Sequence, residues 1–255
     1  ARYFPLHLLW LPDDTDAEGP VPLAVSFAGE QSLALIRTGW DDEAAWLGIK
    51  GGTGAASHGQ LDVGSFVYDA GGTRWFHDLG ADNYNLPGYF GSKRWEYLRL
   101  NNRSHNTLVI DDALQVTPEE GCQVTEWKEN GTRRGLSIDL SPVYRNQARS
   151  VVRQVIFDTA DGSVVMRDRI VSPGGPVRWA MVTRADFEID GRRVTLVQDG
   201  KRLVVTRKDD SGGEWRKISL TPRTASEARN DAFHMLGFTA EPSARMMLDV
   251  GWKLD

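Results

Sequence analysis

Residues 57–78 read SHGQLDVGSFVYDAGGTRWFHD, and this stretch decides the fold of the chain. Residues 65–69 and 73–78 are rich in aromatic and β-branched side chains, and they flank the pair Gly71-Gly72. Two consecutive glycines supply the positive φ angles that a tight hairpin turn requires. The stretch therefore predicts a two-stranded β-hairpin.

The same pattern of apolar run, turn and apolar run continues on both sides of this hairpin. Turn pairs occur at Asn130-Gly131, Asp161-Gly162, Asp190-Gly191 and Asp199-Gly200. Strands are expected at residues 33–38, 44–50, 65–69, 73–78, 107–110, 123–129, 134–140, 149–157, 163–171, 177–183, 187–189, 194–198, 202–207, 215–220, 233–239 and 245–250. Side chains alternate along many of them, as in a sheet with one solvated face. The sequence predicts an all-β fold, a large antiparallel β-sandwich.

Composition limits the functions that the chain can have. Its 255 residues suffice for one large all-β domain or two smaller ones with a real core. A net charge of −5 argues against non-specific binding to nucleic acid. No apolar run approaches the roughly 18 residues of a membrane-spanning helix. Cys122 is the only cysteine, which excludes an internal disulfide. We expect neither a nucleic-acid partner nor a membrane partner.

The two ends of the chain differ in character. Residues 1–12 begin with Ala1 and are too apolar for a free terminus, so we expect them to be the tail of an upstream domain. Residues 13–23 are rich in acidic residues, Gly and Pro and are expected to be a linker. The sandwich is expected to occupy residues 24–255, either as one unit or as a main sandwich to about residue 175 followed by a smaller C-terminal sheet.

Side chains capable of chemistry gather in residues 51–115. A tyrosine-rich loop there contains Tyr84, Tyr89 and Tyr97. Residues 91–105 carry four cations against the single acid Glu96. These cations are Lys93, Arg94, Arg99 and Arg103. They either meet an anionic ligand or form a solvated loop face, and the residues alone leave both readings open.

Gln60, Asp78 and His105 are brought together if the predicted strands are neighbours. Histidine and aspartate are ordinary zinc ligands, whereas a glutamine oxygen is a weak one. On residue types alone, a hydrogen-bonded polar cluster is favoured over a metal site. The sequence contains no GxSxG, HExxH, P-loop or CxxC motif. His234 lies among apolar residues of a predicted strand and is expected to be structural.

Residues 57–115 resemble the heparinase II/III-like polysaccharide lyases, a family that includes enzymes acting on heparin, heparan sulfate and oligoalginate. The residues that carry this resemblance occur in the family's order. They are SHGQLDVGSF at 57–66, DLG at 78–80, Tyr84, Arg94-Trp95, HNTLVID at 105–111 and Gln115.

The resemblance implies an N-terminal α/α toroid, antiparallel β-sandwich domains after it, and an active site in the cleft between them. Residues 1–12 would then be a short helical remnant of the toroid. The implied reaction is β-elimination on a uronate polysaccharide, in which a base removes the C5 proton and an acid protonates the departing glycosidic oxygen. The site must neutralise the carboxylate next to C5. A bacterial periplasmic or secreted location is also implied.

The resemblance also assigns roles to residues. His58 matches the family's active-site histidine near the substrate carboxylate, and Tyr84 matches the sandwich tyrosine that lines the cleft. If the loop aligns differently with the family's sequence pattern, Tyr89 takes that place. Beside this match, we expect the cations Lys93, Arg94 and Arg99 to bind the acidic polysaccharide or oligosaccharide.

The sequence departs from the family in two ways. Asp78 and His105 match two ligands of a structural zinc, but the family's His-x-His pattern has Gln60 at its second histidine. We therefore expect zinc to be absent or weakly bound, with Gln60, Asp78 and His105 hydrogen-bonded to one another. The toroid, which carries the family's other catalytic residues, is missing from these 255 residues and is expected in cis or as a companion chain.

Two other functions compete with the lyase. The first is a non-catalytic carbohydrate-binding or scaffolding sandwich, in which the histidines only hold loops. The second is a glycoside hydrolase, which needs two opposed carboxylates at a cleft. Asp62 and Asp78 make a poor pair for that role because Asp78 already has a structural one.

Overall fold

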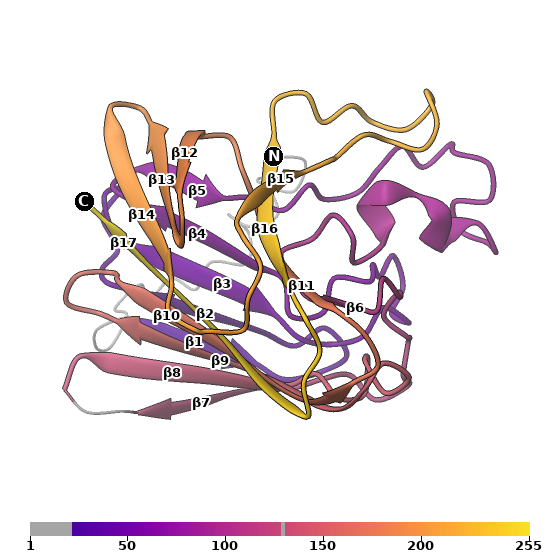
Figure 1. Ribbon diagram of the computed structural model, residues 1–255, viewed down its shortest axis with the longest axis horizontal. Helices are drawn as coiled ribbons and strands as arrows, with labels where there is room; N and C mark the ends of the chain where they lie inside the picture. The colour runs from indigo at the N-terminus through magenta and orange to yellow at the C-terminus, as the bar shows by residue number, and fades with distance from the viewer. Residues whose placement is uncertain (1–21, 129–130) are drawn as a thin grey trace, which may run out of the picture.

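The computed structural model describes residues 22–128 and 131–255, which fold almost entirely into antiparallel β-strands (Figure 1). In chain order the elements are β1 (Ala24–Phe27), β2 (Leu33–Arg37), β3 (Trp46–Lys50), β4 (Phe66–Ala70), β5 (Thr73–Phe76), the 3-10 helices η1 (Arg94–Glu96) and η2 (Leu98–Leu100), β6 (Val109–Ile110), β7 (Val124–Lys128), β8 (Arg133–Asp139), β9 (Ala148–Asp158), β10 (Val164–Pro173), β11 (Val177–Thr183), β12 (Asp186–Asp190), β13 (Arg193–Gln198), β14 (Lys201–Arg207), β15 (Arg216–Ile218), β16 (His234–Ala240) and β17 (Arg245–Leu254). The predicted helical remnant at residues 1–12 lies outside the described residues. Among the described helices, none has the length and apolar character needed to cross a bilayer.

The first sheet is a simple meander in which β1 to β5 pair in chain order. The β4–β5 hairpin closes at Gly71 and Gly72, with φ angles of 60° and 67°, so the glycine pair does form the predicted turn. The sequence did not indicate β1, which has four residues and forms the edge of this sheet.

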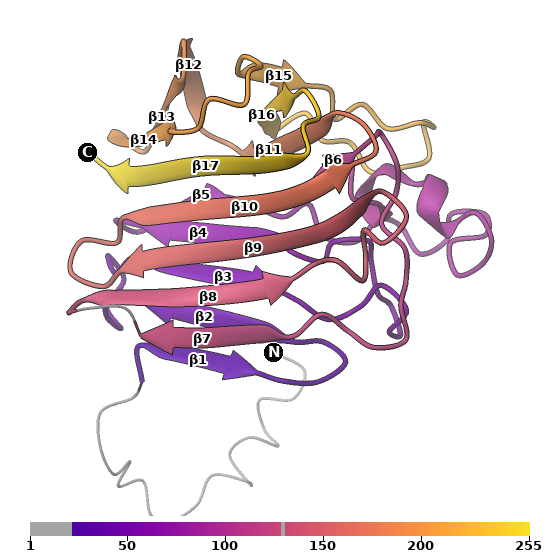
Figure 2. The same cartoon turned by 60° about the horizontal axis from the view of Figure 1, so that its bottom comes forward.

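The second sheet has eight strands in the order β12-β13-β14-β17-β10-β9-β8-β7. Figure 2 shows it lying face to face with the first sheet, with strands of the two sheets running in similar directions. A four-stranded sheet, β15-β16-β11-β6, packs beside them. The expected antiparallel β-sandwich is therefore confirmed. The division near residue 175 stays a prediction; β12–β14 and β17, all beyond that residue, continue the eight-stranded sheet.

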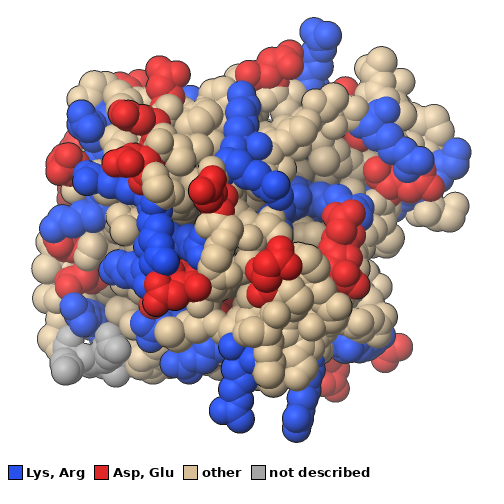
Figure 3. Space-filling view, in the orientation of Figure 1, with Lys and Arg blue, Asp and Glu red and all other residues tan. Residues whose placement is uncertain are grey.

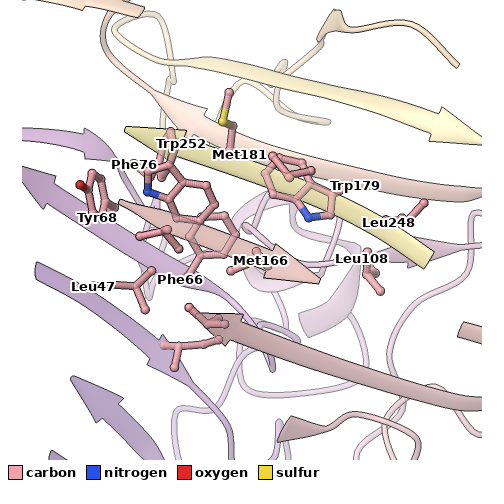
Figure 4. Close-up of a cluster of buried hydrophobic side chains, with 14 of the residues drawn as sticks. Leu47, Phe66, Tyr68, Phe76, Leu108, Met166, Trp179, Met181, Leu248 and Trp252 are labelled. Atoms are coloured by element: carbon pink, nitrogen blue, oxygen red, sulfur yellow. The ribbon is translucent and has the colours of Figure 1, made fainter. Parts of the chain in front are cut away.

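A large hydrophobic core joins the three sheets, and its centre is aromatic (Figure 4). Phe66 of β4 stacks on Trp252 of β17 with ring centroids 5.5 Å apart, and Phe76 of β5 meets the same tryptophan edge to face at 5.0 Å. Trp179 of β11 lies 5.9 Å from Phe66 and brings the third sheet into contact. Burying each of these rings contributes about 1.5–3 kcal/mol, so the aromatic residues hold the sheets together.

One ion pair is fully enclosed by this core. Arg153 of β9 and Asp168 of β10 are cross-strand partners, and the guanidinium donates to both carboxylate oxygens at 2.7 and 2.8 Å. Its remaining Nη1 donates to the carbonyl oxygens of Gly64 and Asn106 at 2.7 and 3.0 Å. Both carbonyls belong to loops at one end of the sandwich. Arg153 therefore ties those loops to the eight-stranded sheet.

Candidate functional site

The candidate site lies at the end of the sandwich where the β3–β4 loop and the β5–β6 loop meet, on the right of Figure 1. These loops contain every site residue predicted from the sequence. The long β15–β16 loop packs against the second of them, since Glu227 accepts from the Leu98 amide at 2.9 Å. The sheets thus provide a fixed base and the loops provide the functional side chains.

His58 is exposed and occupies a strained backbone conformation. It lies in the turn that the Gly59 amide closes by donating to the Ala56 carbonyl at 2.8 Å. Its φ angle is 58°, in the left-handed region, which costs free energy for any residue with a Cβ atom although His enters it more often than most. Such strain concentrates at functional sites. The turn presents the imidazole outward at the edge of the β3–β4 loop.

The His58 ring joins two exposed aromatic side chains of the β5–β6 loop. It stacks on Tyr84 with ring centroids 5.7 Å apart and planes inclined by 23°, and it meets Phe90 edge to face at 5.5 Å. Tyr84 is 51% exposed and Phe90 is 59% exposed. We call His58, Tyr84 and Phe90 the aromatic cluster. It offers an imidazole, a phenol and an apolar ring side by side to an incoming ligand.

Tyr89, the alternative to Tyr84, lies beneath this cluster and is only 2% exposed. Its ring packs against Tyr84 at 5.0 Å and Phe90 at 4.8 Å. Burial raises the pKa of Tyr89, which disfavours the phenolate that a general base would need. Between the two tyrosines, Tyr84 is the one open to a ligand.

Arg94 connects the two loops that form the cluster. Its guanidinium donates to the Gly59 carbonyl at 2.6 and 3.2 Å and to the Tyr89 carbonyl at 2.9 Å. It also lies over the Tyr89 ring, 4.9 Å from the centroid. Gly59 follows His58 and Tyr89 precedes Phe90, so Arg94 fixes the spacing of the cluster. Its predicted role in binding substrate remains a prediction.

The other predicted cations lie in different settings. Arg99 donates to Asn230 Oδ1 and to the carbonyls of Leu79, Ala81 and Arg229, which fastens the β15–β16 loop. Lys93 is exposed, and among the described residues its ammonium group has no hydrogen-bond or ion-pair partner. Their roles in binding substrate also remain predictions.

Asp78 and His105 form a hydrogen-bonded pair behind the cluster. His105 Nδ1 lies 2.8 Å from Asp78 Oδ2, which also accepts from Ser65 Oγ at 2.9 Å, while Oδ1 accepts from the Gly80 amide. Burial by itself would raise the pKa of Asp78, but the charge of His105 and the hydrogen bonds that the carboxylate accepts hold it well below its usual range. Burial alone would lower the pKa of His105, yet the Asp78 charge raises it. The pair is therefore held as an ion pair at mildly acid pH.

In the described chain these residues are not gathered as a set of three zinc ligands. Asp78 and His105 form the expected hydrogen bond, but the prediction that Gln60 joins them is wrong, because within the described chain Gln60 bonds to neither Asp78 nor His105. Among residues 22–128 and 131–255, no three His, Cys, Asp or Glu side chains gather as a metal site would require. The expectation of absent or weak zinc stays a prediction.

Several residues of the sequence pattern hold the loops in place. Asn106 donates to the carbonyls of Phe66 and His77 at 2.7 and 2.8 Å. Gln115 donates to the Val63 carbonyl and accepts from the Val63 amide, both within the core. Phe90 is the site residue that the sequence reasoning missed. Its only signal was its place directly after Tyr89 in the tyrosine-rich loop.

The two carboxylates weighed for a glycoside hydrolase each have a cationic partner. Asp62 accepts from Lys50 Nζ at 2.6 and 2.7 Å, and Asp78 pairs with His105. A glycoside hydrolase needs one carboxylic acid to stay protonated, and a neighbouring cation opposes that protonation. The geometry therefore offers no acid and base pair of this kind.

Comparison with known proteins identifies the relatives of this architecture. The chain is similar to heparinase III, the BT4657 gene product, with 20% identity and a TM-score of 0.72 over 94% of this chain and 37% of that one. It is also similar to the heparan sulfate lyase HepC from Pedobacter heparinus, with 17% identity and a TM-score of 0.73 over 99% of this chain and 38% of that one. The chain thus spans less than two fifths of the length of either. No curated protein matches the sequence.

The family comparison is independent of these structures. The model described as "Heparinase II/III-like, C-terminal" matches residues 42–246, which is most of the sequence and includes every predicted site residue. This match confirms the resemblance found in residues 57–115. The chain belongs to the heparinase II/III-like C-terminal domain family.

Proposed function

We propose that this chain is the C-terminal sandwich of a polysaccharide lyase that cleaves a uronate polysaccharide by β-elimination. The supporting observation is the exposed stack of His58 on Tyr84, built on a strained turn at the end of the sandwich. A histidine held in the left-handed backbone region lowers the stability of the fold, and a loop without a functional role does not require this strain. An imidazole beside a phenol supplies the two groups that this reaction requires from one wall of a cleft.

Each residue of the stack has a role in this proposal. The His58 imidazole hydrogen-bonds the uronate carboxylate, and so stabilises the negative charge that develops when the C5 proton leaves. The Tyr84 hydroxyl transfers protons between C5 and the glycosidic oxygen as the C4–O bond breaks and the C4–C5 double bond forms. Phe90 packs against the apolar face of a sugar ring. The remaining groups come from a helical domain, in cis or in a companion chain.

The test uses the full-length protein and the ultraviolet absorbance of the unsaturated uronate product. His58→Ala and Tyr84→Phe should each lower kcat/KM at least about a hundredfold, since a positioned proton-transfer group contributes about 10²–10⁴. His234→Ala is the matched control because His234 lies on β16 against Phe187, away from the cluster. Full activity in either cluster variant would refute the proposal.

A non-catalytic carbohydrate-binding sandwich is the second candidate. It is favoured by the large exposure of Tyr84 and Phe90, because aromatic rings with one open face suit sugar rings. Under this alternative, the full-length protein binds uronate oligosaccharides but never forms unsaturated product. Product formation by the wild-type protein excludes it.

We extend the proposal to heparin-like or alginate-like uronate chains as substrates and to a periplasmic or secreted location. Both extensions rest on the family alone. Digestion of sulfated and unsulfated uronate polymers with the full-length protein, and fractionation of the source cells, test them separately.

A further inference from the structure

A hollow of about 540 Å³ opens on the outer face of the eight-stranded sheet, away from the aromatic cluster. It lies where β9 begins, β10 ends and β17 begins. Its lining includes Arg149, Arg169 and Arg245, together with Val171 and Met247. In Figure 3, blue side chains project from the lower edge of the molecule, where β17 begins in Figure 1.

The strand register brings these side chains together. Arg169 pairs with Met247, and Val171 pairs with Arg245, in the antiparallel ladder of β10 and β17. Residues two apart on a strand share a face, so all four point outward. Arg169 and Arg245 are diagonal neighbours, within reach of long side chains. Arg149 also lines the hollow at the start of β9, although the register places its neighbour Ser150, and not Arg149, opposite Val171.

The three guanidinium groups are not neutralised by the protein. None of them forms an ion pair or hydrogen bond with any residue in the described part of the chain, and the lining contains no acid. Other cations of the same face do have partners, since Arg167 binds Asp249 at 2.6 Å. Arg169 and Arg245 carry like charges on neighbouring strands of this face and repel each other, in a protein whose net charge is −5. A bound anion would relieve this repulsion.

We propose that the hollow is a second binding site for an acidic oligosaccharide, a proposal that rests on the proposed function for its class of ligand. Arginine forks bind carboxylate and other oxyanions through two parallel hydrogen bonds. Met247, 47% exposed, and Val171 offer apolar contact to the C–H face of a sugar ring. No aromatic side chain lines the hollow, so it lacks the stacking platform that single-stranded nucleic acids use.

Such a site would hold the polymer while the cleft acts on another part of it. Two linked contacts on one chain raise the effective concentration of polymer at the cleft without any new contact there. The site therefore predicts tighter binding of long substrates than of short ones.

The test titrates a fluorescent, sulfated uronate hexasaccharide into the full-length protein carrying His58→Ala, so that no turnover enters the measurement. Arg169→Gln with Arg245→Gln should weaken binding about tenfold or more, as expected for lost charged hydrogen bonds. The control removes two cations from the same face, Arg193→Gln with Arg202→Gln, and should change binding less than about twofold. Charge lost from the hollow should also make binding less sensitive to salt.

A residue-specific readout keeps the proposal testable if the double variant folds poorly. The methyl NMR signal of Met247 in the otherwise unaltered His58→Ala chain should shift on addition of the hexasaccharide. An unmoved Met247 signal, equal losses in both double variants, or equally tight binding of single-stranded DNA would overturn the proposal. The binding titration does not depend on catalysis. If the wild-type protein forms no unsaturated product, the proposed function is refuted, but the result of the titration still decides whether the hollow binds the oligosaccharide.

Discussion

The backbone strain at His58 leads to a prediction that separates stability from activity. Its φ angle of 58° lies in the left-handed region, where a residue with a Cβ atom is strained by about 1–3 kcal/mol and glycine is not. His58→Gly removes both the ring and the strain, whereas His58→Ala removes the ring and keeps the strain. The difference in the free energy of unfolding between these two variants therefore measures the backbone strain alone.

The magnitudes follow from the contacts of the ring. The stack on Tyr84 and the edge contact with Phe90 are partly exposed, so they contribute at the lower end of the aromatic range, about 0.5–1 kcal/mol together. His58→Ala should then lower the free energy of unfolding by about that amount. His58→Gly should recover about 1 kcal/mol relative to the alanine variant, which leaves it close to the wild type.

The assay is urea unfolding of both variants, with the m-value checked for constancy, beside product formation in the full-length protein. Both variants should lose the lyase activity, although the glycine variant is the more stable. An alanine variant as stable as the glycine variant would refute the claim that the turn is strained. Retained activity in either variant would refute the role of the imidazole.

Three further predictions concern residues behind the cluster. Arg94→Gln should lower the free energy of unfolding by about 2 kcal/mol, speed hydrogen exchange at the Gly59 amide and reduce kcat/KM. Arg94→Lys should restore little of this activity, since one ammonium cannot bridge two carbonyls as the fork does. His105→Gln should lower the free energy of unfolding, and this loss should be largest between about pH 4 and 6.5. Urea unfolding at a series of pH values measures the loss. The loss should shrink as pH rises through the raised pKa of His105. Arg153→Met should cost about 3–5 kcal/mol by leaving Asp168 buried and unpaired.

Each of these predictions has an outcome that contradicts it. Full activity in Arg94→Lys would mean that the cation binds substrate directly and does not position the loops. A stability difference that grows above neutral pH would show that the pair with His105 is not an ion pair. For the buried pair, the double variant Arg153→Met with Asp168→Leu should recover most of the lost stability, and failure to do so would assign the loss to packing.

Local chemistry made the hairpins predictable from the sequence. Gly71-Gly72 and Asp199-Gly200 have the positive φ angles that their residue types favour, and each closes a hairpin where it was expected. The order of the strands left no comparable signal. β17 lies between β14 and β10, far from both in sequence, because the long-range pairing depends on the whole fold.

The site was predictable in its residue types but not in its contacts. His58 and Tyr84 were singled out by their chemistry and by the resemblance to a family, and the structure stacks them. Charge alone could not separate a cation that faces a ligand from one whose donors are occupied by carbonyl oxygens, as in Arg94 and Arg99. Phe90 was missed because an apolar residue in a loop carries no chemical signal.

The buried pair of Arg153 and Asp168 has a consequence for how the chain finds its fold. The two residues lie directly opposite each other on two long strands, β9 and β10. If one strand slid by a single position, its side chains would turn to the opposite face of the sheet. Both charges would then lose their partners, at the cost of an unpaired charge in an apolar interior. The pair thus favours the native register of β9 and β10 during folding, because only this register avoids the cost of burying an unpaired charge.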